Sequence, residues 1–278
     1  MNSSFNLILA VLLLGFNNGS FQTDWDRLNL KGAVATIKVM TFSSSSDSLN
    51  SNHIFSNHTS VTNYDIAGYK VSIFNYDESG NIEKWWEYSR DSLGLRFSEI
   101  CFLSDSTLES TKVRHYNDSG RLIETQTYSA EGALLEKWLN EFDQTEWHEC
   151  TSEQYSPKGK LQETWYYARS QSHDTLIMQL TNRKGKLTDS FIEFYDTNGN
   201  IYERTRYVPS NLAERFTIVY DSSKSIQQVL RHVPKSDIIY RSTFTYTQFD
   251  SSKNWTERFV TYDNNIQYFE RREITYFR

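Results

Sequence analysis

The chain has 278 residues, of which 35 are acidic and 29 are basic, so its formal net charge is -6 at pH 7. This acidic balance leaves no positive footprint for phosphate groups, and we therefore expect no nucleic-acid partner. Aromatic residues make up 15% of the chain, and the mean hydropathy is -0.64. Because aromatic side chains suit a pleated, half-buried surface, the composition favours β-structure with a thin core.

The chain opens with an apolar stretch over residues 5–16. The stretch is shorter than the roughly 20 residues that span a bilayer, and its position suits a secretory leader. We therefore predict a signal peptide over residues 1–20 and an exported protein that is periplasmic, on the cell surface or extracellular. The alternative is a buried N-terminal strand or helix. Because no other segment is apolar enough for a membrane helix, we expect a chain that does not span the membrane after leader removal.

Residues 21–63 are predicted to hold the first strand and a Ser/Asn-rich loop. Residues 33–42 alternate between apolar and polar side chains, as a half-buried strand does. Residues 43–60 contain almost nothing apolar, which predicts a mobile loop or an excursion from the edge of a sheet. Residues 64–278 form one repeat domain without an internal boundary.

One motif recurs eight times in this domain: an aromatic residue in seven of the eight copies and Thr181 in the other, then Asp, Asn or Ser, two free positions, usually Gly, one free position, and an aliphatic or aromatic residue. Asp, Asn and Ser accept hydrogen bonds from nearby backbone amides and so initiate turns, while Gly reaches positive φ without a Cβ clash. The first and last residues of the motif are predicted to pair across two strands. The copies span 76–82, 116–122, 128–134, 155–161, 181–187, 195–201, 220–226 and 249–255, the last two with Lys224 and Lys253 in the glycine position.

Weaker turn signals fill the gaps between the copies, so that a turn recurs about every thirteen residues. They lie near Gly94, Ser106, Glu146, Ser172, Ser210, Lys235 and Asn264. One strand and one turn per unit predict an all-β fold, an elongated antiparallel meander of about fifteen short strands. Open sheets rarely exceed ~10 strands without curling or splitting, so we expect a coiled ribbon, two layers or partial closure.

Aligning the copies on the glycine position produces an acidic column four residues later and a partly aromatic column six residues later. The columns are Lys84, Glu124, Glu136, Glu163, Asp189, Glu203, Gln228 and Glu257, and Trp86, Gln126, Trp138, Trp165, Phe191, Thr205, Leu230 and Phe259. Positions two residues apart in a strand share a face, which predicts one acidic, aromatic strip able to bind a basic peptide or a glycan. The candidate binding residues are Trp86, Trp138, Trp165, Glu136, Glu163 and Glu203. The structural interpretation is that Lys and Arg of intervening strands neutralise the acids and the aromatic rings simply pack.

No pattern singles out a reaction centre, and we expect no catalytic residue, metal or cofactor. Histidines never fall at a metal-ligand spacing, and the nearest cluster is His148, Glu149 and Cys150. No serine nucleophile motif is present. The only cysteines, Cys101 and Cys150, are predicted to lie four strands apart. That is about 19 Å at ~4.8 Å per strand, too far for a disulfide, so both are expected to be free and buried.

The unit Tyr-Asp-x-x-Gly-Asn/Arg-Leu/Ile, as at 76–82, 116–122 and 195–201, resembles the YD repeat of RHS-type proteins and the hairpin repeats of YwqK/MORN-like proteins. The segments 28–34 and 254–258 are similar to small exported repeat proteins of Bacteroidetes-type bacteria. RHS proteins form shells around a toxic C-terminal domain, which we do not expect in this sequence, and YwqK-like proteins are antitoxin-like. The resemblance implies a β-hairpin repeat architecture and supplies no catalytic residue.

These observations predict a non-catalytic exported scaffold or binding module for a protein or glycan at the cell envelope. One alternative is a glycan-active hydrolase that uses carboxylates on one sheet face. Another is an antitoxin-like or immunity-like binding protein. An outer-membrane barrel is disfavoured, because residues 161–167 have no uniformly apolar side and strands of about eight residues are short of the 9–11 needed.

Overall fold

The computed structural model describes residues 23–43, 56–143, 149–263 and 265–278. The predicted signal peptide lies outside these ranges. Among the described residues, no helix is long and apolar enough to cross a lipid bilayer. The elements are the short helix α2 (Asp24–Arg27) and the strands β1 (Val34–Ser43), β2 (Ser56–Tyr64), β3 (Lys70–Tyr76), β4 (Ile82–Arg90), β5 (Arg96–Leu103), β6 (Leu108–Tyr116), β7 (Leu122–Ser129), β8 (Leu134–Phe142), β9 (Glu149–Tyr155), β10 (Leu161–Arg169), β11 (Thr175–Asn182), β12 (Leu187–Tyr195), β13 (Ile201–Val208), β14 (Asn211–Tyr220), β15 (Ile226–Val233), β16 (Ile238–Phe249), β17 (Trp255–Tyr262) and β18 (Asn265–Tyr276).

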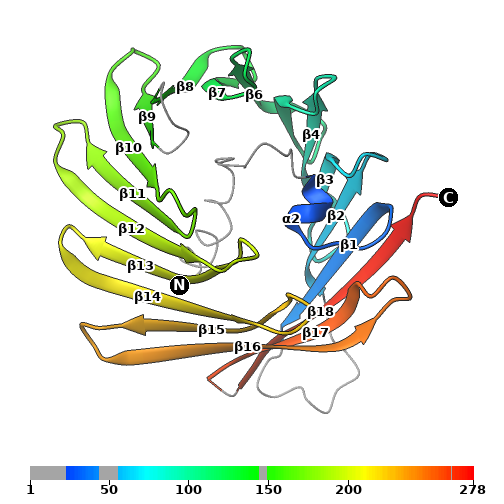
Figure 1. The fold of residues 1–278 in the computed structure, drawn as a ribbon. Coiled ribbons are helices and arrows are strands. Elements are labelled where there is room, and N and C mark those ends of the chain that lie inside the picture. The colour runs from blue at the N-terminus through cyan, green and yellow to red at the C-terminus, as the bar shows by residue number, and fades with distance from the viewer. Residues whose placement is uncertain (1–22, 44–55, 144–148, 264) are drawn as a thin grey trace.

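The strands form one closed antiparallel barrel (Figure 1). Each strand pairs with its neighbours in sequence, and β1 also pairs with β18, for example Ile37 with Ile274. The all-β antiparallel meander is therefore confirmed. The prediction of about fifteen strands in a curled or split sheet is wrong, because the sheet has eighteen strands and closes on itself. Closure depends on pairing between opposite ends of the chain, which no local turn signal encodes.

The motif marks the hairpins correctly. In all eight copies the two flanking residues are cross-strand partners, from Tyr76 with Ile82 to Phe249 with Trp255. The turn position has positive φ whether it is glycine, as in Gly80 (81°), or lysine, as in Lys224 (66°). Beside each flanking pair the register shifts by one residue, which is a β-bulge. Because bulges bend a strand and increase its twist, this repeated irregularity curves the sheet toward closure.

Strand β2 begins inside the segment that was predicted to be a loop up to residue 60. Its sequence is polar, and its position between β1 and β3 supplies hydrogen-bonding partners on both sides. Asn63 accepts a hydrogen bond from Thr36 of β1 and donates one to Ser72 of β3, at 3.0 and 2.9 Å. Pairing rather than hydrophobic alternation therefore makes this segment a strand.

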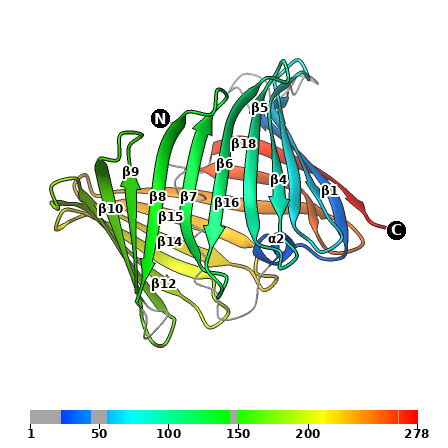
Figure 2. The same cartoon turned by 90° about the horizontal axis from the view of Figure 1, so that it is seen from above.

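Successive hairpins lie at opposite ends of the barrel. We call one end the α2 rim, because α2 lies there against the β2–β3 turn, with the Trp25 amide 3.2 Å from the Gly68 carbonyl oxygen (Figure 2). The α2 rim also holds the turns β4–β5, β6–β7, β8–β9, β10–β11, β12–β13, β14–β15 and β16–β17. The remaining turns lie at the opposite end, the far rim.

Helix α2 lies inside the ring of strands (Figure 1), and its Asp24 contacts Arg90 of β4. The side of the sheet that carries Arg90 is therefore the inner face. Cross-strand partners share a face, and side chains alternate between the two faces along each strand. The pairing register therefore shows, for all remaining strand residues, whether the side chain lies on the inner or the outer face. Buried side chains such as Cys101, Met178 and Val260 lie on the inner face.

The inner face carries two small apolar clusters rather than one thick core. The smaller cluster packs Val34, Ile37 and Tyr64 against Trp25 and Leu30, which attaches the N-terminal approach to the barrel wall. The larger cluster comprises Cys150, Tyr167, Leu176, Met178 and Phe191. Cys101 and Cys150 are both free and buried, on β5 and β9, as the strand count predicts.

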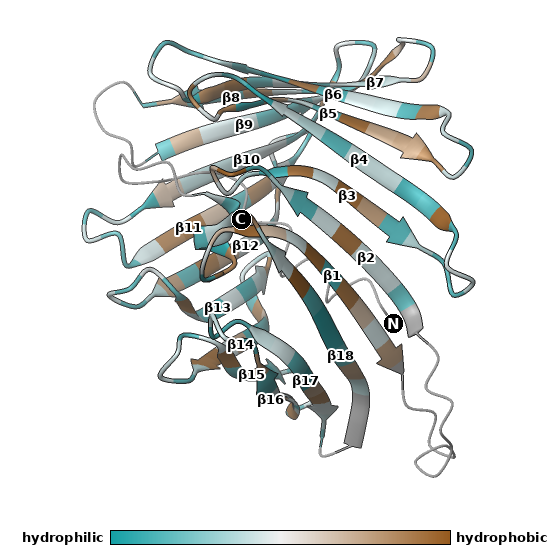
Figure 3. Cartoon of the chain, turned by 90° about the vertical axis from the view of Figure 1, so that its right-hand side faces the viewer, coloured by the Kyte–Doolittle hydropathy of each residue, from teal (hydrophilic) through white to brown (hydrophobic). Residues whose placement is uncertain are grey.

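The outer face is a mixed, charged surface. Hydrophilic and hydrophobic residues alternate along the strands (Figure 3), so that the two faces of the sheet differ in the residues they carry. Ion pairs join neighbouring strands around the circumference, with N–O distances of 2.8 to 3.7 Å. They are Lys38 with Glu273, Lys137 with Glu124, Arg215 with Glu203, and Arg271 with Glu257.

Candidate binding face inside the barrel

The structure places all of the predicted binding residues on the inner face except Glu203. The register links Trp138 to Gln154 and Gln154 to Glu163, and Trp165 lies on the same side of β10 as Glu163. Glu203 instead pairs with Phe194 and Thr217 on the outer face, and its carboxylate lies 3.7 Å from Arg215. Its assignment to the strip was wrong.

The error has a geometric cause. Hairpins of the far rim point their flanking pairs outward, whereas hairpins of the α2 rim point them inward, so the columns that follow also change face. Aligning all copies on the glycine position mixes the inward-pointing and outward-pointing hairpins in one column. Of the acidic column, Lys84, Glu136, Glu163 and Asp189 lie on the inner face, whereas Glu124, Glu203, Gln228 and Glu257 lie on the outer face.

Inside the barrel, three neighbouring strands bring together Glu136, Trp138, Gln154, Glu163 and Trp165, which we call the β8–β10 patch. Gln154 Nε2 donates to Glu136 Oε2 at 2.9 Å, and the indole Nε1 of Trp165 donates to Glu163 Oε1 at 3.1 Å. The patch thus orients two carboxylates, an amide and two indoles on one surface.

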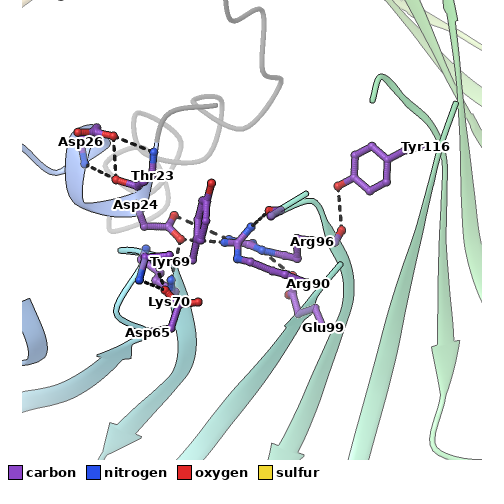
Figure 4. A network of polar contacts seen from close by, with 12 residues as sticks. Thr23, Asp24, Asp26, Asp65, Tyr69, Lys70, Arg90, Arg96, Glu99 and Tyr116 are labelled. Carbon is purple, nitrogen blue, oxygen red and sulfur yellow. Dashed lines mark hydrogen bonds and ion pairs between the residues drawn. The ribbon is translucent and has the colours of Figure 1, made fainter. Parts of the chain in front are cut away.

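The two carboxylates of the patch differ from the other inner-face acids in charge balance. Within the described ranges, neither Glu136 nor Glu163 has a Lys or Arg within ion-pair distance. Elsewhere the inner face pairs its acids, as in the network of Asp24 with Arg90 and Arg96 at the α2 rim (Figure 4). The other paired inner-face acids are Glu99, Glu109, Asp189, Glu193, Glu214 and Glu270. The structural interpretation therefore describes most of the barrel wall but not this patch.

The two indoles of the patch have different surroundings. Trp165 stacks with Tyr167 and Phe191, each with ring centres 6.1 Å away, and so belongs to the larger apolar cluster. Trp138 is half-buried and makes no ring–ring contact with a described residue. The Trp138 indole therefore offers an aromatic surface next to uncompensated carboxylates.

Trp86 lies on the inner face of β4, about 19 Å from Trp138 at ~4.8 Å per strand. Its neighbour Lys84 has its Nζ 5.5 Å from the ring centre and forms an ion pair with Glu109. The hydrogen bond between them raises the pKa of Lys84 and lowers the pKa of Glu109. Trp86 therefore lies beside a neutralised pair and is not part of the β8–β10 patch.

Gln154 is a member of the patch that sequence reasoning missed. It lies outside both columns and becomes the partner of Glu163 because a bulge after Leu161 shifts the register. The flanking pair of Tyr155 and Leu161 is visible in the sequence, but the bulge is not.

In the described part of the chain, no group of three His, Cys, Asp or Glu side chains can hold a metal ion. His148, from the nearest sequence cluster, lies outside the described residues. A shallow depression on the outer face at the far rim is lined by Leu134, Leu139, Tyr155 and Pro157. It is apolar and holds no group of reactive side chains.

Comparison with protein-family models and with curated proteins finds no match. Among solved structures, a porin-like protein from Bacteroides uniformis is 9% identical with a TM-score of 0.39, covering 88% of this chain and 98% of that one. A protein of unknown function from Bacteroides fragilis is 13% identical with a TM-score of 0.28, covering 46% of this chain and 95% of that one. The structure of TcdB2-TccC3-TEV is 12% identical with a TM-score of 0.25, covering 77% of this chain and 18% of that one. At these scores the similarities carry no functional argument.

Proposed function

We propose that the protein is a non-catalytic binding protein of the cell envelope and that the β8–β10 patch holds a glycan. The observation that supports this most directly is the combination on one inner surface of two carboxylates and an indole that have, among the described residues, no cationic partner and no ring partner respectively. The other inner-wall carboxylates of the described chain are paired with cations of the protein, so donor groups of a ligand gain most at this patch.

A glycan matches this surface in two ways. The apolar C–H face of a sugar ring packs on an indole, and Trp138 has a ring available for that contact. Sugar hydroxyl groups donate to carboxylate and amide oxygens, which Glu136, Gln154 and Glu163 supply. A few polar groups around an aromatic surface are the usual makeup of a small-molecule site.

The proposal is tested by probing the full chain on an array of neutral and acidic oligosaccharides and titrating the bound ones by calorimetry. We expect Trp138→Ala to weaken binding roughly tenfold or more, which is ~1.4 kcal/mol. Glu136→Gln combined with Glu163→Gln should weaken it similarly. The matched control is Trp85→Ala, because Trp85 lies on the outer face and stacks with Phe74 and Phe102. Equal affinity of Trp138→Ala and wild type would contradict the proposal.

A basic peptide is the second candidate, because no Lys or Arg in the described part of the chain forms an ion pair with the negative charges of Glu136 and Glu163. The array experiment separates the two when an oligolysine peptide is included as a probe. Binding of oligolysine that weakens steeply with added salt, together with no retained oligosaccharide, would assign the patch to peptides instead.

Placement at the envelope rests on the apolar segment at residues 5–16. It is tested by expressing the full chain, fractionating the cells and measuring the mass of the mature protein. Recovery outside the cytoplasm with the N-terminal residues removed is the expected result. A full-length protein in the cytoplasm would contradict export without affecting the glycan proposal.

A further inference from the structure

A second cluster lies on the wall opposite the β8–β10 patch. Strands β9 and β18 are nine positions apart in the ring of eighteen, so they face each other across the barrel (Figure 1). On β17 and β18, the inner face carries Arg258, Glu270 and Arg272 around Trp255. We call these four residues the β17–β18 cluster.

The β17–β18 cluster contains two cations and one anion. Arg258 Nε forms a short ion pair with Glu270, which uses the only carboxylate of the cluster. Arg272 has its guanidinium carbon 3.4 Å from the centre of the Trp255 ring, while that of Arg258 is 4.4 Å away. No described carboxylate lies within ion-pair distance of Arg272. The cluster therefore carries one uncompensated positive charge.

The surroundings of Arg272 make that charge costly. Its Nε is buried without a hydrogen-bond acceptor in the described chain. Burial and the nearby charge of Arg258 lower the pKa of Arg272, whereas Glu270 raises it less. Buried charges in proteins are normally paired, because an isolated one loses its hydration. A guanidinium in this state gains strongly from an anion that reaches its remaining donors.

The remaining donors of Arg272 are its two Nη groups. Neither of them donates a hydrogen bond to a described residue, and unlike Nε neither is completely buried. The fork of a guanidinium matches the two oxygens of a carboxylate, and the flat Trp255 ring beneath it fixes its plane. Because the β17–β18 cluster has one more positive than negative charge, a ligand with a single negative charge would neutralise it.

We propose that the β17–β18 cluster is a binding site for one organic carboxylate, held by the Nη groups of Arg272 with Arg258 beside it. The site is independent of the glycan proposal, because it lies on the opposite wall and uses different residues. An acidic sugar and a free carboxylic acid present the same group to the site.

The probes are acetate and glucuronate, with acetamide and glucose as uncharged matches and inorganic phosphate as a competing anion. The full chain is labelled with 5-fluorotryptophan, and the fluorine resonance of Trp255 is assigned with Trp255→Phe. At constant ionic strength, we expect acetate or glucuronate to shift the Trp255 resonance saturably and the uncharged matches to leave it unchanged. Phosphate binding more tightly than both carboxylates would contradict the assignment to carboxylates.

The variants separate binding from structure. Arg272→Met is expected to weaken carboxylate binding at least tenfold while leaving the melting temperature equal or higher, because it replaces an uncompensated buried charge with an apolar chain. Arg271→Met is the matched control, since Arg271 is adjacent in sequence, points outward and pairs with Glu257 at 2.8 Å. Unchanged carboxylate affinity in Arg272→Met, or no saturable shift with either carboxylate, would overturn the proposal.

Discussion

Asp24 Oδ2 accepts a hydrogen bond from Arg90 Nη2 at 2.8 Å, joining α2 to the inner face of β4. The same oxygen accepts from the Lys70 amide at 2.8 Å, and Arg96 Nη2 lies 3.9 Å from Oδ1. The side chain of Asp24 is 7% exposed and that of Arg90 is 15% exposed. One buried carboxylate thus connects the N-terminal approach with strands β3, β4 and β5.

Asp24→Ala is expected to lower the free energy of unfolding by about 3–5 kcal/mol, because it leaves the largely buried Arg90 without its anion and removes one of the two carboxylates beside Arg96. Asp26→Ala is the comparison. It removes only the exposed capping box between Thr23 and Asp26, which is worth about 0.5–2 kcal/mol. Urea denaturation followed by circular dichroism measures both. A smaller loss for Asp24→Ala than for Asp26→Ala would show that α2 is not attached in this way.

The ion pair of Glu193 and Arg204 tests the inner wall in a different region. The two residues are 3% and 7% exposed, and their charged groups lie 3.3 Å apart. Glu193→Ala should cost about 3–5 kcal/mol, whereas Glu193→Met combined with Arg204→Met should restore most of the stability, because no charge is then left buried. Glu273→Ala, in an exposed outer pair with Lys38, should cost no more than ~1 kcal/mol. Additive losses in the double variant would contradict this reasoning.

The degenerate motif copies predict a stabilising change. Lys224 and Lys253 have φ values of 66° and 68°, in a region that non-glycine residues adopt at a cost of ~1–2 kcal/mol. Glycine is more flexible when unfolded, so Lys224→Gly is expected to gain only about 0.5–1 kcal/mol. The reciprocal change Gly80→Lys should lose a similar amount, since Gly80 has a φ of 81° and no atom near its Cβ position. Thermal unfolding of both variants gives the comparison.

The two cysteines predict a pH dependence. Burial raises the pKa of Cys101 to about 12, with a contribution from its hydrogen bond to Glu109, and burial raises the pKa of Cys150 to about 12. The native thiols should therefore react slowly with a thiol reagent at neutral pH and rapidly after denaturation. The unfolded chain loses these protons first, so the free energy of unfolding should fall as pH rises from ~9 toward ~12. Replacing both cysteines with Ala should remove that part of the decline.

Local features of the fold were predictable from the sequence because each turn carries its own chemistry. Asp196 illustrates this: its side chain accepts from the amides of Asn198 and Asn200 at 2.8 Å each, as the motif requires. The register of every motif hairpin follows from the flanking pair. The strand count was not predictable, because the polar sequence of β2 does not indicate a strand. Closure was not predictable either, because it depends on pairing between β1 and β18, which are far apart in the sequence.

The candidate site was only partly predictable, because it too depends on how distant parts of the chain are arranged. Trp138, Trp165, Glu136 and Glu163 could be selected by spacing, but the face of each column depends on which rim its hairpin occupies. Glu203 was misplaced on that account. Arg272 gave no signal, because it lies outside the motif copies and its importance depends on how few carboxylates surround it.

The seam between β1 and β18 joins Ile37 to Ile274, which are 237 positions apart (274 minus 37). A nascent polypeptide can form each hairpin as it leaves the ribosome. Until β18 has been made, however, the sheet has two unpaired edge strands. Unpaired edges recruit strands from other molecules, so two copies whose barrels have not yet closed can exchange β18 once it is made and close each other's barrels. Slow translation of the final segment should therefore raise the yield of intertwined dimers.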